Sequence, residues 1–410
     1  MIPLMKNKYA SQTISAIFLV AGTCIGGGML ALPVATAING FIPSTLIMLC
    51  AWLAMTCTAL YLVEAGFWMK NDEAHLISMS KTLLGKPGAY TSWILYLFIC
   101  YASLIAYTAG GGMLFTHALS VSPEMGCLFF TLLFGPSLFL SHKTLGKINA
   151  SLFLVMIGIF VLLLCLALPK IQTPLLLREQ WHGSWMTLSL LLTAFSFQTL
   201  VPSLHPYLNH HGPSLRVAII GGTALAFIVY LIWQITVLGI VPLEGPNGLL
   251  QAYNEGQAAT HALGKAVGSS LIELLATLFA FFALATSYLG ISLGLYDFLS
   301  DGLKITKKGW GNICLGLLII LPTYIGSIAF ERVFLSALNA SGGFGDAILN
   351  GIIPVLMIVI GRYYMKLPKT TFHAPGGRGF LLAAFLFYVS ALAIEVLSRL
   401  GHLTLIHTLD

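Results

Sequence analysis

Gly22-Thr23-Cys24-Ile25-Gly26-Gly27-Gly28 stands in the middle of an apolar run that extends from about residue 14 to residue 38. A run of this length is too long for a core helix of a soluble protein and is typical of a membrane span. Four glycines in seven residues do not support an unbroken helix, because each costs up to about 1 kcal/mol relative to alanine. In hydrocarbon, irregular backbone survives only where protein buries it or where it lines a cavity. The stretch therefore predicts a broken first span with a binding site at the break.

The composition of the whole chain agrees with a membrane protein. Of its 410 residues, 58% are apolar and only 8% are charged, whereas soluble domains carry roughly 25% charged residues. The formal charge of +6 comes from basic residues scattered singly between apolar runs, which argues against nucleic-acid binding. The seven cysteines form no CxxC pair, so we expect neither a metal site nor a disulfide framework, and no cofactor. We predict an all-α polytopic membrane protein that forms one transmembrane domain over residues 1–410.

The apolar runs predict eleven membrane helices. They cover residues 11–37, 42–68, 88–116, 126–141, 147–168, 184–208, 214–241, 263–300, 310–329, 345–365 and 378–400. With the N-terminus in the cytoplasm, 15 of the 20 Lys and Arg residues fall on the cytoplasmic side, as the positive-inside rule requires. This orientation leaves the C-terminus outside. The longest outside segment, residues 245–264, is a candidate lid.

The sixth predicted span is interrupted in a similar way to the first. Residues 193–199 (Thr-Ala-Phe-Ser-Phe-Gln-Thr) are followed by Pro202 and Pro206, and proline removes an amide donor and clashes with the preceding turn. Two interrupted helices five spans apart are typical of an inverted-repeat transporter with its site at the bilayer midplane. The repeats would cover about 11–168 and 184–365, with the helix 378–400 appended. The alternative is that each break is a kink tolerated by packing.

Three motifs resemble one family of transporters. They are Gly22-Thr23-Cys24-Ile25-Gly26-Gly27-Gly28-Met29-Leu30-Ala31-Leu32-Pro33, then Ala283-Leu284-Ala285-Thr286-Ser287-Tyr288-Leu289-Gly290 running on to Asp297, and Gly342-Gly343-Phe344-Gly345. These stretches resemble the bacterial hydroxy/aromatic amino acid permeases, and most of all the tyrosine-specific members. The similarity extends from about Ser11 to the eleventh span. It implies the LeuT-type fold of the amino acid–polyamine–organocation superfamily, with helices 1 and 6 discontinuous.

The resemblance also implies a substrate site at the two breaks. Backbone amides of Gly26, Gly27 and Gly28 would hold the substrate carboxylate, and the positive end of a half-helix suits an anion. Carbonyls near Thr23 and Phe195-Ser196 would hold the ammonium group. The side-chain pocket is expected to involve Phe197, Gln198, Tyr101, Tyr107 and Tyr288.

A cation site is implied beside the substrate site. Ala283, Thr286 and Ser287 have the spacing of sodium ligands in LeuT-type symporters, and the carbonyls of Gly22 and Ile25 would complete the set. The alternative is that the two hydroxyls bond to the backbone of their own helix. The coupling ion stays open between proton and sodium.

Ionisable residues in the spans are candidates for a role in proton coupling. Four acidic residues lie near span ends, where we expect them to snorkel or cap, and a fifth opens the tenth span; they are Glu64, Glu273, Asp297, Glu395 and Asp346. Glu64, Glu273 and His205 are kept as candidates for a proton-linked role.

The sequence therefore predicts a secondary symporter rather than an enzyme. The expected cargo is an aromatic amino acid, L-tyrosine first, imported across a bacterial inner membrane; tryptophan or another hydroxy or neutral amino acid is the alternative. A membrane-embedded enzyme or a channel is the alternative from another class, but the sequence offers no converging set of catalytic groups. The expected partners are the amino acid substrate and the bilayer. Spans one, two, six and seven would rock against the rest to alternate access.

Overall fold

The computed structural model of the chain describes residues 2–69, 75–329 and 332–402, and in these residues the secondary structure is helical. The main helices are α1 (Ile2–Cys24), α2 (Gly27–Thr36), α3 (Phe41–Phe67), α4 (Leu76–Leu119), α5 (Pro123–Phe134), α6 (His142–Ala167), α8 (Leu188–Ala194), α9 (Val201–Tyr207), α10 (Gly212–Leu238), α11 (Leu249–Asn254), α12 (Ala259–Val267), α13 (Ser270–Leu303), α14 (Trp310–Ser327), α15 (Val333–Ala340), α16 (Ile353–Val359) and α17 (Arg378–Arg399). The π-helical segment η6 (Ser341–Ile352) joins α15 to α16, and a second one, η7 (Ile360–Tyr364), extends α16, so that the four segments form one long rod.

Nine helices in the described residues are long and apolar enough to cross a membrane, and the bent pair formed by α1 and α2 makes ten. These ten match ten of the eleven predicted spans. The predicted fourth span corresponds to Pro123–Phe139, which is apolar but shorter than the others.

The path of this short helix supports a crossing. Near its start, Gly126 packs against Gly112 close to the C-terminal end of α4, and at its end Phe139 packs against Gly316 near the start of α14. Its 17 residues rise about 25 Å, close to the thickness of the hydrocarbon core. The predicted fourth span would therefore need both the helix and its short 3₁₀ turn to reach across, and it stays a prediction.

Two predicted boundaries were wrong. The predicted eighth span, 263–300, is two helices: α12 ends at Gly268, whose φ of +65° lies in the left-handed region that glycine adopts without strain. The predicted tenth span, 345–365, begins instead at Val333 and runs to Tyr364, because the glycines at 342–345 stay helical. The second correction moves residue 346 from the end of a span to its interior.

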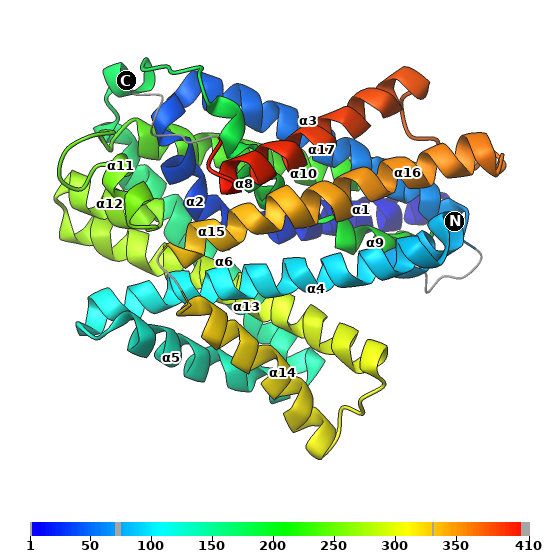
Figure 1. Cartoon of the computed structure of the whole chain (residues 1–410), viewed down its shortest axis with the longest axis horizontal. Helices are drawn as coiled ribbons and strands as arrows, with labels where there is room; N and C mark the ends of the chain where they lie inside the picture. Colours follow the sequence, from blue (N-terminus) through cyan, green and yellow to red (C-terminus); the bar gives the residue numbers. More distant parts are fainter. Residues whose placement is uncertain (1, 70–74, 330–331, 403–410) are drawn as a thin grey trace.

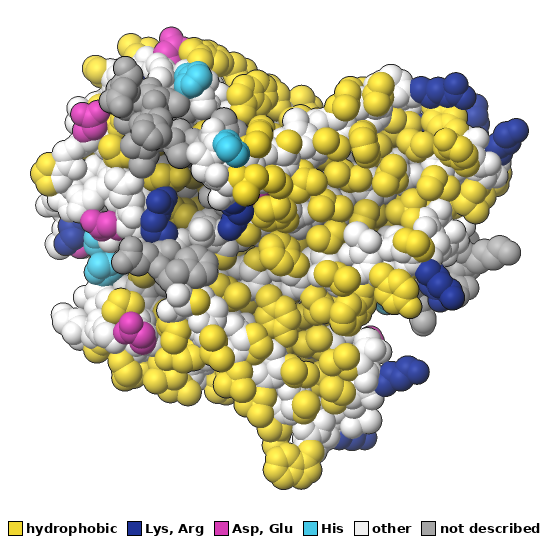
Figure 2. Space-filling view, in the orientation of Figure 1, with side chains coloured by type: hydrophobic (Ala, Val, Ile, Leu, Met, Phe, Trp, Pro, Cys, Tyr) yellow, Lys and Arg dark blue, Asp and Glu magenta, His cyan; other side chains and the backbone are white. Residues whose placement is uncertain are grey.

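The long helices lie side by side along one axis of the molecule (Figure 1). The closest packing partners are α1 with α10, α13 with α6, and α4 with both α5 and α13. Side chains over the middle of the molecule are mainly hydrophobic, while Lys and Arg gather at the end where α1 begins, and most of the acidic side chains lie at the opposite end (Figure 2). This distribution is the one expected of a bundle that crosses a bilayer.

Candidate functional site

The first predicted break is present. The helix stops at Cys24, restarts at Gly27 and bends by 54°. Gly26 between them has an extended backbone (φ −163°, ψ −152°), and the three consecutive glycines are buried. Backbone groups at such a break lack their helical partners, so the buried amides at the start of α2 have no acceptor within their own helix.

The second predicted break is also present, between α8 and α9. Phe195 and Phe197 leave the helical conformation (φ −98°, ψ 19° and φ −146°, ψ 0°). The Gln198 side chain accepts a bond from the Phe197 amide (2.9 Å) and donates to the Met55 carbonyl in α3 (3.0 Å). Gln198 therefore holds the break in shape and ties it to α3, although we predicted it for the pocket.

The two breaks lie against each other. A Cβ atom built on Gly28 would lie 3.5 Å from the Ala194 Cα atom. The Tyr230 hydroxyl in α10 lies 2.5 Å from the Cys24 carbonyl oxygen and 2.7 Å from that of Ala194. One buried phenol thus connects the carbonyl at the end of α1 with the carbonyl at the end of α8.

Two further helices reach the first break. Ser287 of α13 accepts a hydrogen bond on Oγ from the Gly27 amide (2.9 Å). The ring of Tyr107 in α4 covers the same glycine, so that a Cβ atom at Gly27 would lie 2.5 Å from the ring. The structure therefore brings together four predicted site residues: Gly26, Gly27, Tyr107 and Ser287.

Two other tyrosines predicted for the pocket wall have contacts with α14 and α5. The Tyr101 hydroxyl donates to the Leu318 carbonyl of α14 (2.7 Å), whose normal helical donor would be residue 322, a proline. Tyr101 thus satisfies a carbonyl that Pro322 leaves without a partner. Tyr288 is buried with its ring edge-on to Phe130 of α5.

At the end of α1 we predicted roles only for carbonyl groups, and the side chains there lie away from the site. The Thr23 side chain is exposed, and its hydroxyl donates to the Leu19 carbonyl (2.8 Å). Gly22 faces the Phe153 ring of α6, and the Ile25 amide continues the helical bonding of α1. Any role of these three residues therefore rests on their carbonyl groups.

The predicted cation ligands on α13 differ in whether they reach the first break. The Thr286 hydroxyl bonds to its own helix, at 2.9 Å from the Phe282 carbonyl oxygen and 3.2 Å from that of Ala283, as the alternative reading expected. Ser287 alone reaches the first break. In this conformation the Ala283 carbonyl and the Thr286 hydroxyl satisfy each other.

The largest correction concerns Asp346. We expected it to open the tenth span, but it lies inside the rod from Val333 to Tyr364 and is fully buried. Its Oδ1 atom accepts bonds from the Ser196 hydroxyl at the second break (2.6 Å) and from the Asn350 side chain (2.6 Å). The misplaced boundary concealed this residue, since an aspartate in mid-span is itself a signal of function.

Two proton-linked candidates have different surroundings. Glu64 is 1% exposed, so the expectation that water reaches it was wrong. It accepts bonds from Arg362 Nε (2.7 Å) and from the Ala374 amide (2.6 Å). Glu273 lies half-exposed and pairs with Lys265 at 3.0 Å, a surface ion pair at the start of α13.

The remaining ionisable candidates lie away from the breaks. Asp297 pairs with Lys307 at 2.7 Å on the surface, as expected of a residue at a span end. Glu395 is 6% exposed but bonds to Arg399 at 2.7 Å. The third proton-linked candidate, His205, is buried, and its imidazole packs edge-on to a phenylalanine ring of α3.

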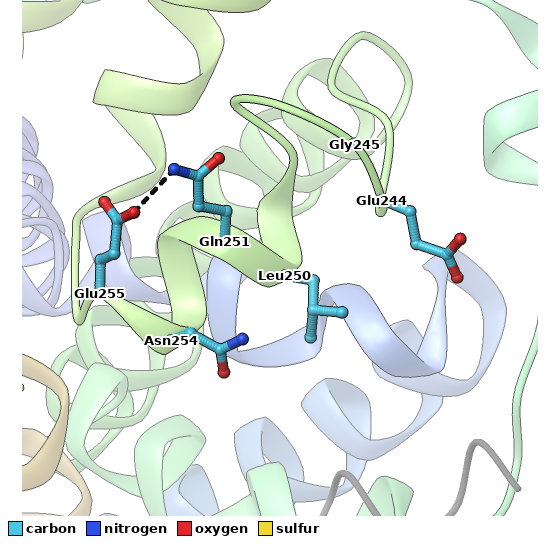
Figure 3. A pocket seen from close by; sticks show the side chains of 6 residues that line it. All are labelled: Glu244, Gly245, Leu250, Gln251, Asn254 and Glu255. Atoms are coloured by element: carbon cyan, nitrogen blue, oxygen red, sulfur yellow. Dashed lines mark hydrogen bonds between the residues drawn. The ribbon is translucent and has the colours of Figure 1, made fainter.

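The predicted lid segment folds into α11 and α12, which pack against α2. A hollow of about 350 Å³ lies beside α11 (Figure 3). It is lined by Glu244, Gly245, Leu250, Gln251, Asn254 and Glu255. The Gln251 side chain donates to Glu255 Oε1 (2.7 Å) within this lining. The hollow belongs to the surface segment and not to the buried breaks.

Comparisons with known proteins give one consistent result. Residues 9–395 match the model of the tryptophan/tyrosine permease family. The tyrosine-specific transport system 1 of Haemophilus influenzae is 31% identical over 96% of this chain and 98% of its own length. The tryptophan-specific transport protein of the same organism is 28% identical over 97% and 98%. Among solved structures, a manganese transporter from Eremococcus coleocola is similar in fold, with a TM-score of 0.62, 13% identity and coverage of 96% of this chain and 87% of that one.

Proposed function

Because the chain belongs to the tryptophan/tyrosine permease family, we propose that it imports L-tyrosine by cation symport. The family and the fold make the chain a multi-pass membrane transporter of aromatic amino acids, not an enzyme. Tyrosine in preference to tryptophan, and the coupling to a cation, are the proposed refinements. The tyrosine-specific relative supports the first of them.

The observation that carries the proposal is the contact between the two helix breaks. An amino acid in a membrane interior needs partners for both its charges, because an unpaired charge in low dielectric is costly. At the first break, the amides of Gly26, Gly27 and Gly28 lie at the positive end of α2, which suits a carboxylate. At the second break, the irregular backbone at Phe195 and Ser196 provides carbonyl groups for the ammonium.

In the structure, the Ser287 hydroxyl binds the Gly27 amide. We expect the substrate carboxylate to take over this amide when it enters, which frees Ser287 to face a cation. The Tyr107 ring that covers the glycine would then lie beside the substrate. Glycine is needed here because it lets a ligand approach the backbone closely.

We place the protein in a bacterial inner membrane with its N-terminus in the cytoplasm and its C-terminus outside. The cluster of basic side chains at the end where α1 begins supports this orientation (Figure 2), since cytoplasmic ends carry the excess of Lys and Arg. Labelling a cysteine added at the C-terminus from outside intact cells tests it. Protection of that cysteine would contradict the orientation or the odd number of spans.

Counterflow in liposomes tests the transport proposal. Vesicles containing the purified protein and unlabelled tyrosine should take up labelled tyrosine faster than empty vesicles, because a carrier returns loaded more readily than empty. Unlabelled tryptophan and phenylalanine added outside report the preference. Tyrosine that neither exchanges nor competes would refute the tyrosine assignment, and no exchange of any aromatic amino acid would refute the transport proposal.

The coupling ion is tested by imposing sodium and proton gradients separately. The variants Thr286→Val and Ser287→Ala remove one hydroxyl each from the proposed cation site. If sodium is the coupling ion, Ser287→Ala should weaken the sodium dependence more than Thr286→Val, whose hydroxyl bonds to its own helix. If the sodium and pH dependence of uptake is unchanged in both variants, the proposal of a cation site on α13 is contradicted.

A further inference from the structure

The carboxyl group of Asp346 is the most unusual buried group in the described chain. It lies in the middle of a membrane-spanning rod and has no solvent exposure. Oδ1 accepts two hydrogen bonds, from Ser196 and Asn350, both at 2.6 Å. Oδ2 is buried without a hydrogen-bond partner. The two oxygens of the carboxyl group therefore differ in their surroundings, because Oδ1 accepts hydrogen bonds and Oδ2 accepts none.

The charges around Asp346 do not neutralise it. Within the described residues, no Lys, Arg or His pairs with it; the ionisable groups that interact with it are Cys100 and Tyr107 of α4 and Tyr388 of α17. Free thiols and phenols carry no charge near neutral pH. Glu395 of α17 packs on the neighbouring Gly343 but is already paired with Arg399. An ionised Asp346 would therefore be an uncompensated charge, which is costly in a dry interior.

The backbone places this carboxyl against the second break. Asp346 belongs to η6, a π-helical segment, and π-helical turns are frequently found at functional sites. Gly342 lets η6 approach α8 so closely that a side chain there would collide with the Ser189 carbonyl. Ser196 bonds to the carboxyl from the break, and Asn350 donates to Ser196 Oγ as well (3.1 Å). A change of backbone conformation at the second break would therefore alter the hydrogen bonds of the Asp346 carboxyl group.

We propose that Asp346 is the proton-binding residue of this transporter, coupled to the second helix break through Ser196. The proposal rests on the proposed symport and names its coupling group. The carboxylate takes up one proton on Oδ2 from water on the outer side and becomes neutral. The occluded, dry state of the structure then holds the neutral acid. When the inner side opens, water reaches the carboxyl group and the proton leaves to the cytoplasm.

The geometry favours a proton over a larger cation at Asp346. A proton needs a single unpartnered oxygen, which Asp346 Oδ2 supplies, whereas a metal cation needs several oxygen ligands around it; Asn350 Oδ1 and Ser341 Oγ are the other buried oxygens of η6 without a partner. Both protein donors point at Oδ1, and a bound metal cation would repel the hydrogen atoms that they direct to this oxygen. The substrate ammonium is the remaining rival, because Ser196 lies at the break.

Asp346→Asn is the principal test, since asparagine resembles the protonated acid in shape and cannot release a proton. We expect counterflow of labelled tyrosine to continue within about twofold of the wild type, while accumulation driven by a pH gradient falls at least tenfold. Asp346→Glu, which keeps the carboxyl group, should retain part of the accumulation. Asp301→Asn changes an exposed aspartate at the end of α13 and should leave both activities unchanged.

The outcomes separate this proposal from the function on which it rests. Accumulation by Asp346→Asn under a pH gradient would overturn the proposal. Loss of counterflow in a monodisperse Asp346→Asn protein would also overturn it, because the carboxyl group would then hold the substrate ammonium. Absence of aromatic amino acid counterflow in the wild type would instead be a failure of the proposed transport function.

Ser196→Ala gives a second test that a merely structural role would not pass. The Ser196 hydroxyl donates to Asp346 Oδ1 and so favours the charged form. Its removal should move the pH midpoint of proton-driven uptake to more alkaline values, by about one pH unit. If Asp346→Asn does not fold, the shift of the pH midpoint in Ser196→Ala tests the proposal instead. An unchanged pH midpoint would contradict the coupling between Asp346 and the second break.

Discussion

Gly27, at the start of α2, is packed against both α4 and α13, and its lack of a side chain is a requirement of this packing. A Cβ atom there would lie 2.5 Å from the Tyr107 ring and 3.1 Å from Leu284. We predict that Gly27→Ala displaces the ring and reduces tyrosine counterflow at least tenfold. Gly158→Ala is the matched control, because a Cβ atom at Gly158 in α6 meets nothing within 4 Å. Equal counterflow in the two variants would show that the close approach at Gly27 is not needed.

Trp233 satisfies a carbonyl that a proline leaves without a partner. The Met29 carbonyl would normally bind the amide of residue 33, which is a proline, and the Trp233 indole donates to it instead (3.1 Å). Trp233→Phe should strand this buried carbonyl at a cost of about 1–3 kcal/mol, seen as a lower unfolding temperature in detergent. Trp310→Phe, at an indole that is 85% exposed, should have little effect. Similar unfolding temperatures for both variants would mean that the carbonyl finds another donor.

At the scale of elements, Tyr230 of α10 joins the two broken helices. Its hydroxyl lies within hydrogen-bond distance of the carbonyls that end α1 and α8. Tyr230→Phe removes the single O–H donor that the two buried carbonyls share, and the loss of this donor is worth about 1–3 kcal/mol. We predict a slower tyrosine exchange and a lower unfolding temperature. Tyr90→Phe, at a side chain that is 69% exposed, is the control. Tyrosine exchange at the wild-type rate in Tyr230→Phe would show that the Tyr230 hydroxyl is not needed at the site.

The breaks themselves were predictable because their cause is local. Clustered glycines and the prolines after residue 200 weaken helical bonding wherever they occur, so the sequence alone locates both interruptions. The partner of both breaks was not predictable, because Tyr230 acts on carbonyl groups far away in the chain. A single tyrosine in an apolar helix belongs to no repeating sequence pattern, so nothing in the sequence marks it as a site residue. Asp346 was missed for another reason: glycines at 342–345 indicate a loop, whereas close packing against α8 keeps them helical.

The whole molecule is closed at both ends of the central site. At one end, Arg178 donates to the Ala37 carbonyl (3.0 Å), and the neighbouring Glu179 pairs with Gly40. At the opposite end, Glu64 of α3 binds Arg362 of η7. Because the glycines of the first break are buried, we expect a substrate to enter only when helices move apart, and these two closures are contacts that such a movement would break. The second closure joins predicted span two to predicted span ten, so it connects the group of helices expected to rock with the group expected to stay still.

This second closure should also be a main contributor to stability. The Glu64 side chain is 2% exposed and that of Arg362 is 9% exposed. Breaking a buried ion pair by removing one partner costs about 3–5 kcal/mol, because the other charge stays buried. We therefore predict that Glu64→Gln lowers the unfolding temperature strongly. Glu273→Gln, which breaks the half-exposed pair with Lys265, should cost less than about 1 kcal/mol.

A double variant separates the ion pair from the rest of its surroundings. If the cost of Glu64→Gln comes from stranding the arginine, Arg362→Met added to it should recover part of the lost stability, because no buried charge remains. If the cost comes instead from the Ala374 amide that Glu64 also binds (2.6 Å), the second substitution should recover nothing. Recovery accompanied by faster tyrosine exchange would mean that the pair holds the inner end closed during transport. Recovery at an unchanged exchange rate would assign the pair to stability alone, and opening would then be limited elsewhere.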